Sequence, residues 1–402
     1  MKRLLSIFIL SFLVAGYLYW LSGGIFASLV GSGVVVVVCL ALYFIETIFS
    51  SSSNIGSLEK KKKSNSFDWG MHYFRAFAIL CIVLVHFFNK MGYREISKSF
   101  FDTSTIFFLF ISGYLCQFLD LKKKTEPIVY YKKKLLNVVL PYIICTLATV
   151  AIVFVCGVHK VYVASPEDLT AIGLIKMFLF GRAQVQYWYI PFIVIVFAFS
   201  PLLLRLNNYV IVMVTIVAAV VAVIFPERGR LFSIEYPNCL YLYTYFMIYY
   251  LLGFVYARFK DMIDPWLKKY FWIMLITGLI IAVWKHWPEA LKLTMVHGDL
   301  ALGVQKVAFT GVALVLLMKI KDRKIALLDT MAKYSFTYYF LHCLFIQDYI
   351  NLQTKIAGII ECDMVMPVVN LGLTLMYVAE LVIVGCLLKS ALGKYSRMFI
   401  GS

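Results

Sequence analysis

An arginine and a histidine lie eleven positions apart in one apolar stretch of the sequence, His72 to Asn89 (HYFRAFAILCIVLVHFFN). A helix turns about 100° per residue, so Arg75 and His86 fall on one stripe, roughly 16 Å apart along the axis. Arginine suits an anionic ligand, and histidine suits proton transfer near neutral pH. The shared stripe predicts one lined cavity with an anion at one end and a proton acceptor at the other. The alternative is that Arg75 extends to the lipid headgroups and His86 hydrogen-bonds a neighbour.

The elements that must position these residues are membrane helices. The 402 residues are 62% hydrophobic and only 15% charged, whereas a soluble domain is about one-quarter charged. The apolar residues form about twelve blocks of a length that spans roughly 30 Å of hydrocarbon as helix. The sequence therefore predicts an all-α, polytopic transmembrane bundle. The blocks run approximately over residues 4–21, 25–49, 71–90, 100–119, 136–157, 186–206, 209–225, 239–258, 270–287, 300–319, 333–350 and 366–388.

The net charge of +17 would suit nucleic acid, but its distribution indicates a membrane protein instead. If the N-terminus is cytoplasmic and twelve spans follow, the loops and tails on that side hold 25 of the 38 Lys and Arg residues and the other side holds 11. Basic residues concentrate in cytoplasmic loops. We therefore expect both termini in the cytoplasm and no nucleic-acid partner.

The first two spans contain no histidine, and the stretch VGSGVVVVVCLALYF is typical of a lipid-facing helix. The polar segment Ser51–Ser66 follows them and reads as a solvated linker. We therefore divide the chain into a two-span N-terminal appendage with a basic linker (1–66) and a ten-span core (67–402). The segment 169–180 is long enough for a short interfacial helix. The nine cysteines contain no CxxC pair, which indicates neither a disulfide framework nor a metal site.

Five motifs follow one another along the core. They are YFRAFAILCIVLVH (73–86), FFLFISGYL (107–115), KKKLLNVVLPY (132–142), WYIPFIVIVFAFSP (188–201) and KYSFTYYFLH (333–342). In type and order they resemble the motifs of the membrane acyltransferase-3 family. Three positions depart from the family pattern. His72 stands where the family often has an acidic residue, Asn137 where it has a second basic residue, and Gln186 where it often has a histidine.

The resemblance implies an integral enzyme of the cytoplasmic membrane. Such an enzyme transfers an acyl group, usually acetyl, from cytoplasmic acyl-coenzyme A to a hydroxyl of a glycan or of its lipid-linked precursor. It implies no tightly bound cofactor; acyl-CoA is a substrate, and the lipid bilayer and the glycan acceptor are the expected partners.

The resemblance and the residue chemistry together suggest roles at both ends of the stripe. Arg75, Lys133 and Lys134 are candidates for binding the donor phosphates, although the lysines also suit charge-directed topology. His86 would take the proton of the acceptor hydroxyl or carry the acyl group itself. Asp102 would orient the imidazole, as the third member of a catalytic triad does, or it is a helix-start carboxylate.

Further polar residues are candidates for the cavity lining. Ser335, Tyr338 and His342 share one helix face and would line a substrate cavity or form an internal hydrogen-bonded cluster. Ser112, beside Gly113, would line the cavity or allow close helix packing. Tyr187 and Trp188 would stack on a sugar or belong to an interfacial aromatic belt.

Two other classes of protein remain open. A transporter or flippase of a lipid-linked glycan would also have about twelve spans, but it calls for several buried charges and broken helices. A non-catalytic scaffold would have no use for the costly Arg75 and His86.

Overall fold

The structure, a computed structural model, describes Ser6, Ile9 and residues 68–122, 126–156, 170–225, 239–284, 298–359 and 366–401. Within these ranges every element is a helix, which confirms the predicted all-α class. The N-terminal appendage predicted over residues 1–66 lies outside the described residues, except for Ser6 and Ile9.

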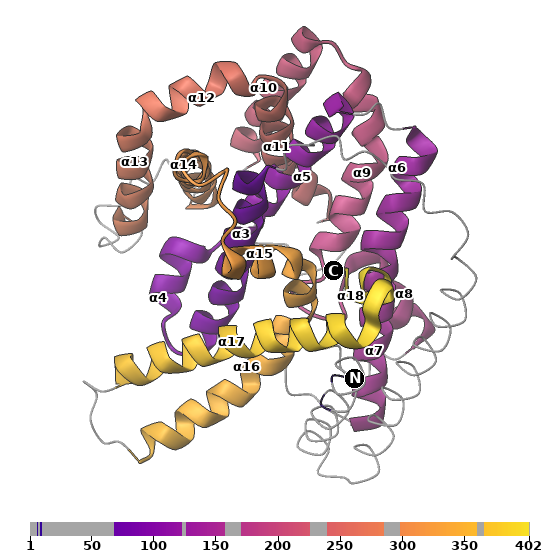
Figure 1. The fold of residues 1–402 in the computed structure, drawn as a ribbon, viewed down its shortest axis with the longest axis vertical. Helices are drawn as coiled ribbons and strands as arrows, with labels where there is room; N and C mark the ends of the chain where they lie inside the picture. Colours follow the sequence, from indigo (N-terminus) through magenta and orange to yellow (C-terminus); the bar gives the residue numbers. More distant parts are fainter. Residues whose placement is uncertain are drawn as a thin grey trace.

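The helices keep the labels of Figure 1. They are α3 (Trp69–Lys90), α4 (Arg94–Ile96), the π-helix η1 (Ser97–Phe101), α5 (Thr105–Lys122), α6 (Pro127–Lys134), the π-helix η2 (Leu135–Val139), α7 (Leu140–Cys156), α8 (Ala171–Phe180), α9 (Tyr189–Arg205), α10 (Asn208–Ile224), α11 (Cys239–Arg258), α12 (Lys260–Lys269), α13 (Phe271–Trp284), α14 (Gly298–Met318), α15 (Ala326–Lys333), α16 (Ser335–Ala357), α17 (Met366–Leu392), the 3-10 helix η5 (Gly393–Tyr395) and α18 (Ser396–Ile400). Helix α8 confirms the short helix expected at 169–180.

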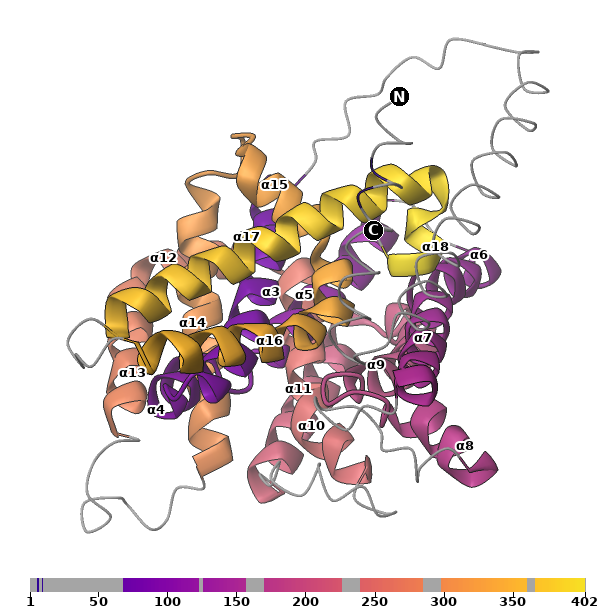
Figure 2. The same ribbon diagram turned by 90° about the horizontal axis from the view of Figure 1, so that it is seen from below.

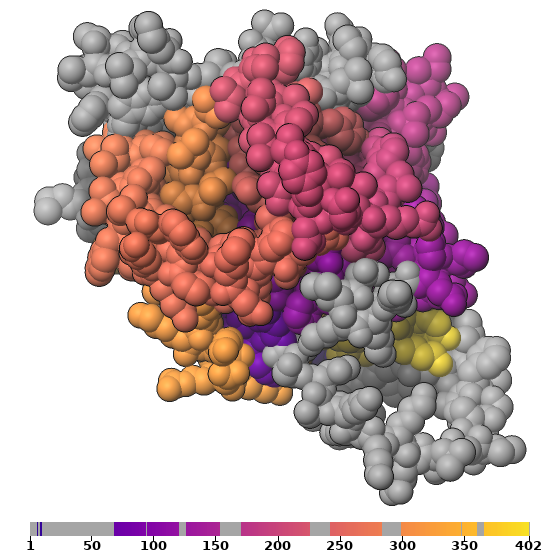
Figure 3. Space-filling model, turned by 90° about the horizontal axis from the view of Figure 1, so that it is seen from above, coloured from indigo at the N-terminus to yellow at the C-terminus, as the bar shows by residue number. Residues whose placement is uncertain are grey.

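Helix α3 lies in the interior and packs against α5, α14, α15, α16 and η1. Figures 1 and 2 show the paired helices α16 and α17 along one side of it and α14 along another. In the space-filling view of Figure 3, later helices cover most of the coloured surface and the indigo residues of α3 emerge only between them. The helix that carries Arg75 and His86 is therefore surrounded by protein on several sides.

By length and composition, the described chain contains five helical segments that can cross a membrane. There are six if the bent pair Lys260–Lys269 and Phe271–Val283 is one span. Shorter apolar helices accompany them, among them α9 and α10 with 17 residues each. The protein is therefore a multi-pass membrane protein. The count of twelve spans and the cytoplasmic termini stay predictions.

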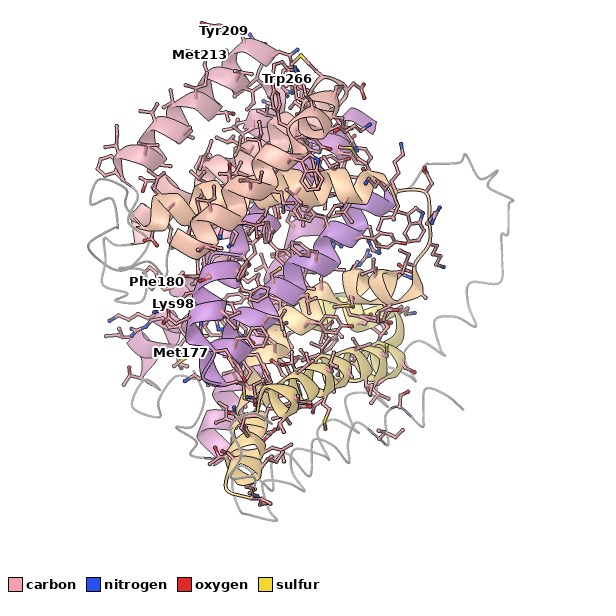
Figure 4. All side chains as sticks on the ribbon, turned by 90° about the vertical axis from the view of Figure 1, so that its left-hand side faces the viewer. Lys98, Met177, Phe180, Tyr209, Met213 and Trp266 are labelled. Atoms are coloured by element: carbon pink, nitrogen blue, oxygen red, sulfur yellow. The ribbon has the colours of Figure 1, made fainter. Side chains whose placement is uncertain are left out.

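Large apolar side chains on the outer helices are exposed, as a lipid-facing surface requires. Tyr209 and Met213 of α10 and Trp266 of α12 have exposed fractions of 73%, 42% and 60%. Figure 4 shows these three residues at one end of the molecule. Aromatic side chains at the end of a bundle are typical of membrane–water interfaces.

Helices α5 and α11 approach each other closely through reciprocal glycines. A Cβ atom built on Gly113 would lie 1.9 Å from the Tyr250 carbonyl oxygen, and one built on Gly253 would lie 1.9 Å from the Phe110 carbonyl oxygen. Small residues let membrane helices pack backbone to backbone. This contact supports the packing interpretation of the Ser112–Gly113 motif.

We predict that Gly113→Ala destabilises the protein, because the new methyl group must push α5 and α11 apart. Overpacking of this kind costs about 1–3 kcal/mol. The measurement is the thermal unfolding midpoint of the purified protein in detergent. Gly372→Ala in α17 is the matched control, because nothing lies within 4 Å of its new Cβ. Equal midpoints for both variants would contradict the close approach.

Candidate active site

A carboxylate at the start of α3 fixes the position of this helix. Asp68 accepts hydrogen bonds from the Met71 backbone N–H (3.0 Å) and the Tyr114 hydroxyl (2.6 Å), and Lys260 Nζ lies 3.2 Å from its Oδ2. Burial alone would raise the pKa of Asp68, but these hydrogen bonds and the lysine charge together lower it. The ionised carboxylate therefore caps α3 and joins it to α5 and α12.

A second carboxylate joins α3 to α15. The Asp329 Oδ1 atom lies 3.0 Å from His72 Nε2, and its Oδ2 lies 2.7 Å from Lys333 Nζ. Burial alone would raise the pKa of Asp329, but the hydrogen bonds from Lys333 and His72 outweigh it and lower that pKa. His72, which departs from the family pattern, thus has an acidic partner from a distant part of the sequence.

Three cations from three helices come together near the start of α3. Arg75 of α3 lies within electrostatic range of Lys134 of α6 and of Arg397 of α18. Its positive charge is repelled by each of the other two. Within the described ranges, no ion pair links any of them to a carboxylate. Lys134 instead lies over the Phe197 ring, 3.6 Å from its centroid. Positive charge that the described protein leaves uncompensated suits a multiply charged anion.

The two lysines predicted to bind the donor are placed differently. Lys134 is half-buried beside Arg75, whereas Lys133 is exposed. Adjacent residues of a helix point about 100° apart, so only one of them faces Arg75. We therefore assign Lys134, not Lys133, to the cation cluster. Arg397 joins it and was not foreseen.

A small apolar groove flanks the stripe between Arg75 and His86. Ile79 and Val83 of α3 form one wall, and Met331, Tyr338, Leu381 and Val382 form the others. Tyr338 is 3% exposed, and its hydroxyl has no hydrogen-bond partner. The groove offers a hydrocarbon surface to a ligand that reaches from the cations toward His86.

At the far end of the stripe, His86 faces His342 of α16. Their ring centroids are 5.1 Å apart. His342 is fully buried, and its Nδ1 lies 2.9 Å from the Tyr338 carbonyl oxygen and 3.0 Å from that of Tyr339. Because carbonyls only accept hydrogen bonds, Nδ1 carries the proton. The Nε2 atom is then unprotonated, and it has no hydrogen-bond partner.

Asp102 lies in a turn that the protein fixes tightly. It ends η1, its Oδ1 accepts a hydrogen bond from the Thr103 N–H at 2.8 Å, and Thr103 has a φ of 60°, which is unusual for a non-glycine residue. Its charge acts on His86.

Helix α14 also supports this turn. Lys306 Nζ donates to the Phe100 carbonyl at 2.9 Å, and Gln305 donates to the Ser99 carbonyl at 2.8 Å. Backbone strain held in this way is typical of functional sites.

The other predicted lining residues are mostly internal. Tyr187 is 1% exposed and donates to the Phe340 carbonyl at 3.4 Å, so it belongs to the core and not to an interfacial belt. Trp188 is half-buried at the start of α9. Ser335 is buried one turn before Tyr338 on α16. The Ser112 hydroxyl lies 3.5 Å from that of Tyr189.

The class of protein is therefore a multi-pass, all-helical membrane protein whose central helix joins a cation cluster to a histidine pair. The family model of the acyltransferase domain, acyltransferase-3, matches residues 68–388. The chain belongs to this family, as the five motifs indicated. Comparison with curated proteins and with solved structures finds no match.

We predict that Asp329→Asn lowers the unfolding midpoint at neutral pH, because it leaves His72 and Lys333 without their carboxylate. Loss of a hydrogen-bonded charge costs about 1–3 kcal/mol. The pKa of Asp329 is lower in the folded protein than the usual value of 3.8. Its stabilisation of the fold is therefore complete above that usual pKa and is lost as the pH falls through the pKa of the folded protein. Unfolding measured from pH 3 to 7 should therefore show the wild-type advantage shrinking below about pH 4. A pH-independent difference would contradict this assignment.

Proposed function

We propose that this acyltransferase moves an acyl group, acetyl in the simplest case, from cytoplasmic acyl-CoA to a hydroxyl of a cell-surface glycan or of its lipid-linked precursor. The observation that carries the proposal is the arrangement along α3. Uncompensated cations lie at one end, His86 lies about 16 Å away on the same stripe and faces His342 of α16, and a small apolar groove flanks the path between them.

Acyl-CoA fits this arrangement because its charge and its reactive bond are far apart. Phosphates at one end would bind Arg75, Lys134 and Arg397 through charge-assisted hydrogen bonds. The uncharged arm would lie along the apolar side chains of this groove, which would have to part to admit it, and would bring the thioester to His86. The basic end would face the cytoplasm, in line with the expected topology.

His86 would act as the base of the reaction. It takes the proton from the attacking hydroxyl, and the Asp102 carboxylate stabilises the imidazolium that forms. Base catalysis of this kind contributes about 10²- to 10⁴-fold. His342 cannot donate from Nε2 and so would accept a hydrogen bond from the hydroxyl or from His86.

The direct experiment supplies purified protein in nanodiscs with acetyl-CoA carrying a radiolabelled acetyl group, together with membrane glycolipids of the source cell. Label that moves from CoA to a glycan as a base-labile ester supports the proposal. A carrier of lipid-linked glycan would move the acceptor across the bilayer without labelling it, and that result would replace acyl transfer with transport.

We predict that Lys134→Met raises the KM for acetyl-CoA by about 10- to 100-fold, which corresponds to one lost charge-assisted hydrogen bond to phosphate. The value of kcat should change little, because the phosphates bind alike in the ground and transition states. Lys133→Met is the matched control: it removes the same charge from the preceding residue, which is exposed. Equal effects of the two variants would place the phosphates elsewhere.

We predict that His86→Gln lowers kcat by at least about 10²-fold, with little change in acetyl-CoA binding, because Arg75 and Lys134 hold the donor. Glutamine keeps the side chain polar and of similar size, so the variant should insert and fold. Its elution in size-exclusion chromatography and donor binding by calorimetry provide the check. Wild-type transfer by His86→Gln would remove this histidine from the chemistry.

A further inference from the structure

A third reactive group lies beside the two histidines. The Cys343 sulfur and one ring nitrogen each of His86 and His342 all lie within 4.8 Å of one another. Cys343 is a free thiol, 1% exposed, on the same helix as His342. Of the free cysteines in the described chain (Cys81, Cys116, Cys145, Cys343 and Cys386), this is the one that groups with both histidines.

The orientation of His342 leaves one of its ring nitrogens available as a base. Both backbone carbonyls that bind the imidazole do so at Nδ1, so Nε2 lies on the opposite edge of the ring, away from the α16 backbone. It is fully buried and has no partner. Leaving a buried acceptor without a donor costs about 1–3 kcal/mol, so such an atom calls for an explanation. The Cys343 thiol, or the hydroxyl that attacks its thioester, would supply the missing hydrogen-bond donor.

Burial disfavours the thiolate form of Cys343, so the thiol would have to give its proton to a neighbouring base as it attacks. The charge of Lys90, at the far end of α3, reaches the Cys343 thiol. Reactive cysteines lie next to histidine or a cation, and a nucleophile paired with a base is the usual arrangement of covalent catalysis. His86 is half-buried, whereas His342 and Cys343 are fully buried. A substrate would therefore reach the cluster past His86.

We propose that Cys343 carries the acyl group as a thioester between the donor and the acceptor, with the two histidines exchanging protons in both half-reactions. This inference rests on the proposed function and names the covalent intermediate of that same site.

In the first half-reaction, the Cys343 sulfur attacks the thioester carbon of acyl-CoA and its proton passes to an imidazole nitrogen. The bond from the acyl carbon to the CoA sulfur breaks. The CoA sulfur takes the proton back and leaves as a thiol. One thioester replaces another, so the step needs neither an oxidant nor an energy source.

In the second half-reaction, the acceptor hydroxyl attacks the acyl carbon on Cys343 and gives its proton to the imidazole. The carbon–sulfur bond breaks, an oxygen ester forms, and the Cys343 sulfur regains the proton. Donor and acceptor then need not occupy the membrane interior together, because CoA can leave before the glycan enters.

The test mixes the purified full chain with acetyl-CoA carrying a radiolabelled acetyl group, without acceptor, and quenches within one turnover. We expect label on the protein that neutral hydroxylamine removes, and peptide mass spectrometry should place the acetyl group on Cys343. Adding the glycan acceptor should discharge it at the rate of overall transfer. Steady-state kinetics should give the parallel lines of a ping-pong mechanism.

Two variants and one control sharpen the result. Cys343→Ala should take up no label and lose transfer by about 10³-fold or more, as loss of a nucleophile does. Cys343→Ser keeps the size of the side chain and should trap the acetyl group slowly as an ester that resists neutral hydroxylamine. Cys116→Ala is the matched control, a buried thiol outside the cluster, and should label as the wild type does.

Three results would overturn the inference. The first is wild-type transfer by Cys343→Ala. The second is label that stays on a histidine in that variant. The third is a stoichiometric transition metal that the wild type holds and Cys343→Ser lacks, because two imidazoles and a thiolate also form a metal-donor set. If glycan esters form without any Cys343 label, the carrier role fails while acyl transfer stands. If the wild type forms no ester with any donor, the proposed function itself fails.

Discussion

The position of α3 depends on Asp68, a carboxylate that three helices share. It caps α3 through the Met71 N–H and also binds Tyr114 of α5 and Lys260 of α12. One turn later, the Tyr73 hydroxyl donates to the Arg323 carbonyl and accepts from the Ile325 N–H, both at 2.6 Å. These bonds fix the rotation of α3 about its own axis. A helix turned by one residue would move its polar stripe by about 100° and separate Arg75 from Lys134 and His86 from His342.

The two ends of α3 are supported by different means, and the difference would suit the roles proposed for them. The end of α3 that the predicted topology puts at the cytoplasm is held by the hydrogen bonds of the ionised Asp68 and Asp329. Arg75 takes no part in these bonds. The other end is held by packing and by backbone bonds: Phe87 stacks on Tyr377 with centroids 4.6 Å apart, and the Ser97 hydroxyl donates to the Val85 carbonyl at 2.9 Å. A rigid histidine pair and an unneutralised cation cluster are thus joined by a helix that cannot easily rotate.

Sequence reasoning found what lies within one helix and missed what distant segments contribute. The stripe of Arg75 and His86 follows from the helical period alone, and the motifs identified the family that the match over 68–388 confirms. Local spacing could not choose between Lys133 and Lys134, because either residue can face the bundle. Asp329, Arg397 and Cys343 lie more than 250 residues from their partners on α3, and no periodicity links them. Tyr187 was open to a belt interpretation because an aromatic residue at a helix start suits both interface and core.

The cation cluster at α3 has an energetic consequence for the empty protein. Arg75, Lys134 and Arg397 repel one another in a region from which Arg75 cannot easily withdraw, so the unliganded fold contains an electrostatic cost that any bound polyanion removes. A ligand that binds only the folded state adds RT ln(1 + [L]/Kd) to its stability, about 2.7 kcal/mol at one hundred times Kd. If an anion fills the cluster as proposed, the lifetime of this protein in its membrane would follow the concentration of that anion, and the supply of the ligand and the abundance of the protein would be coupled without any regulator.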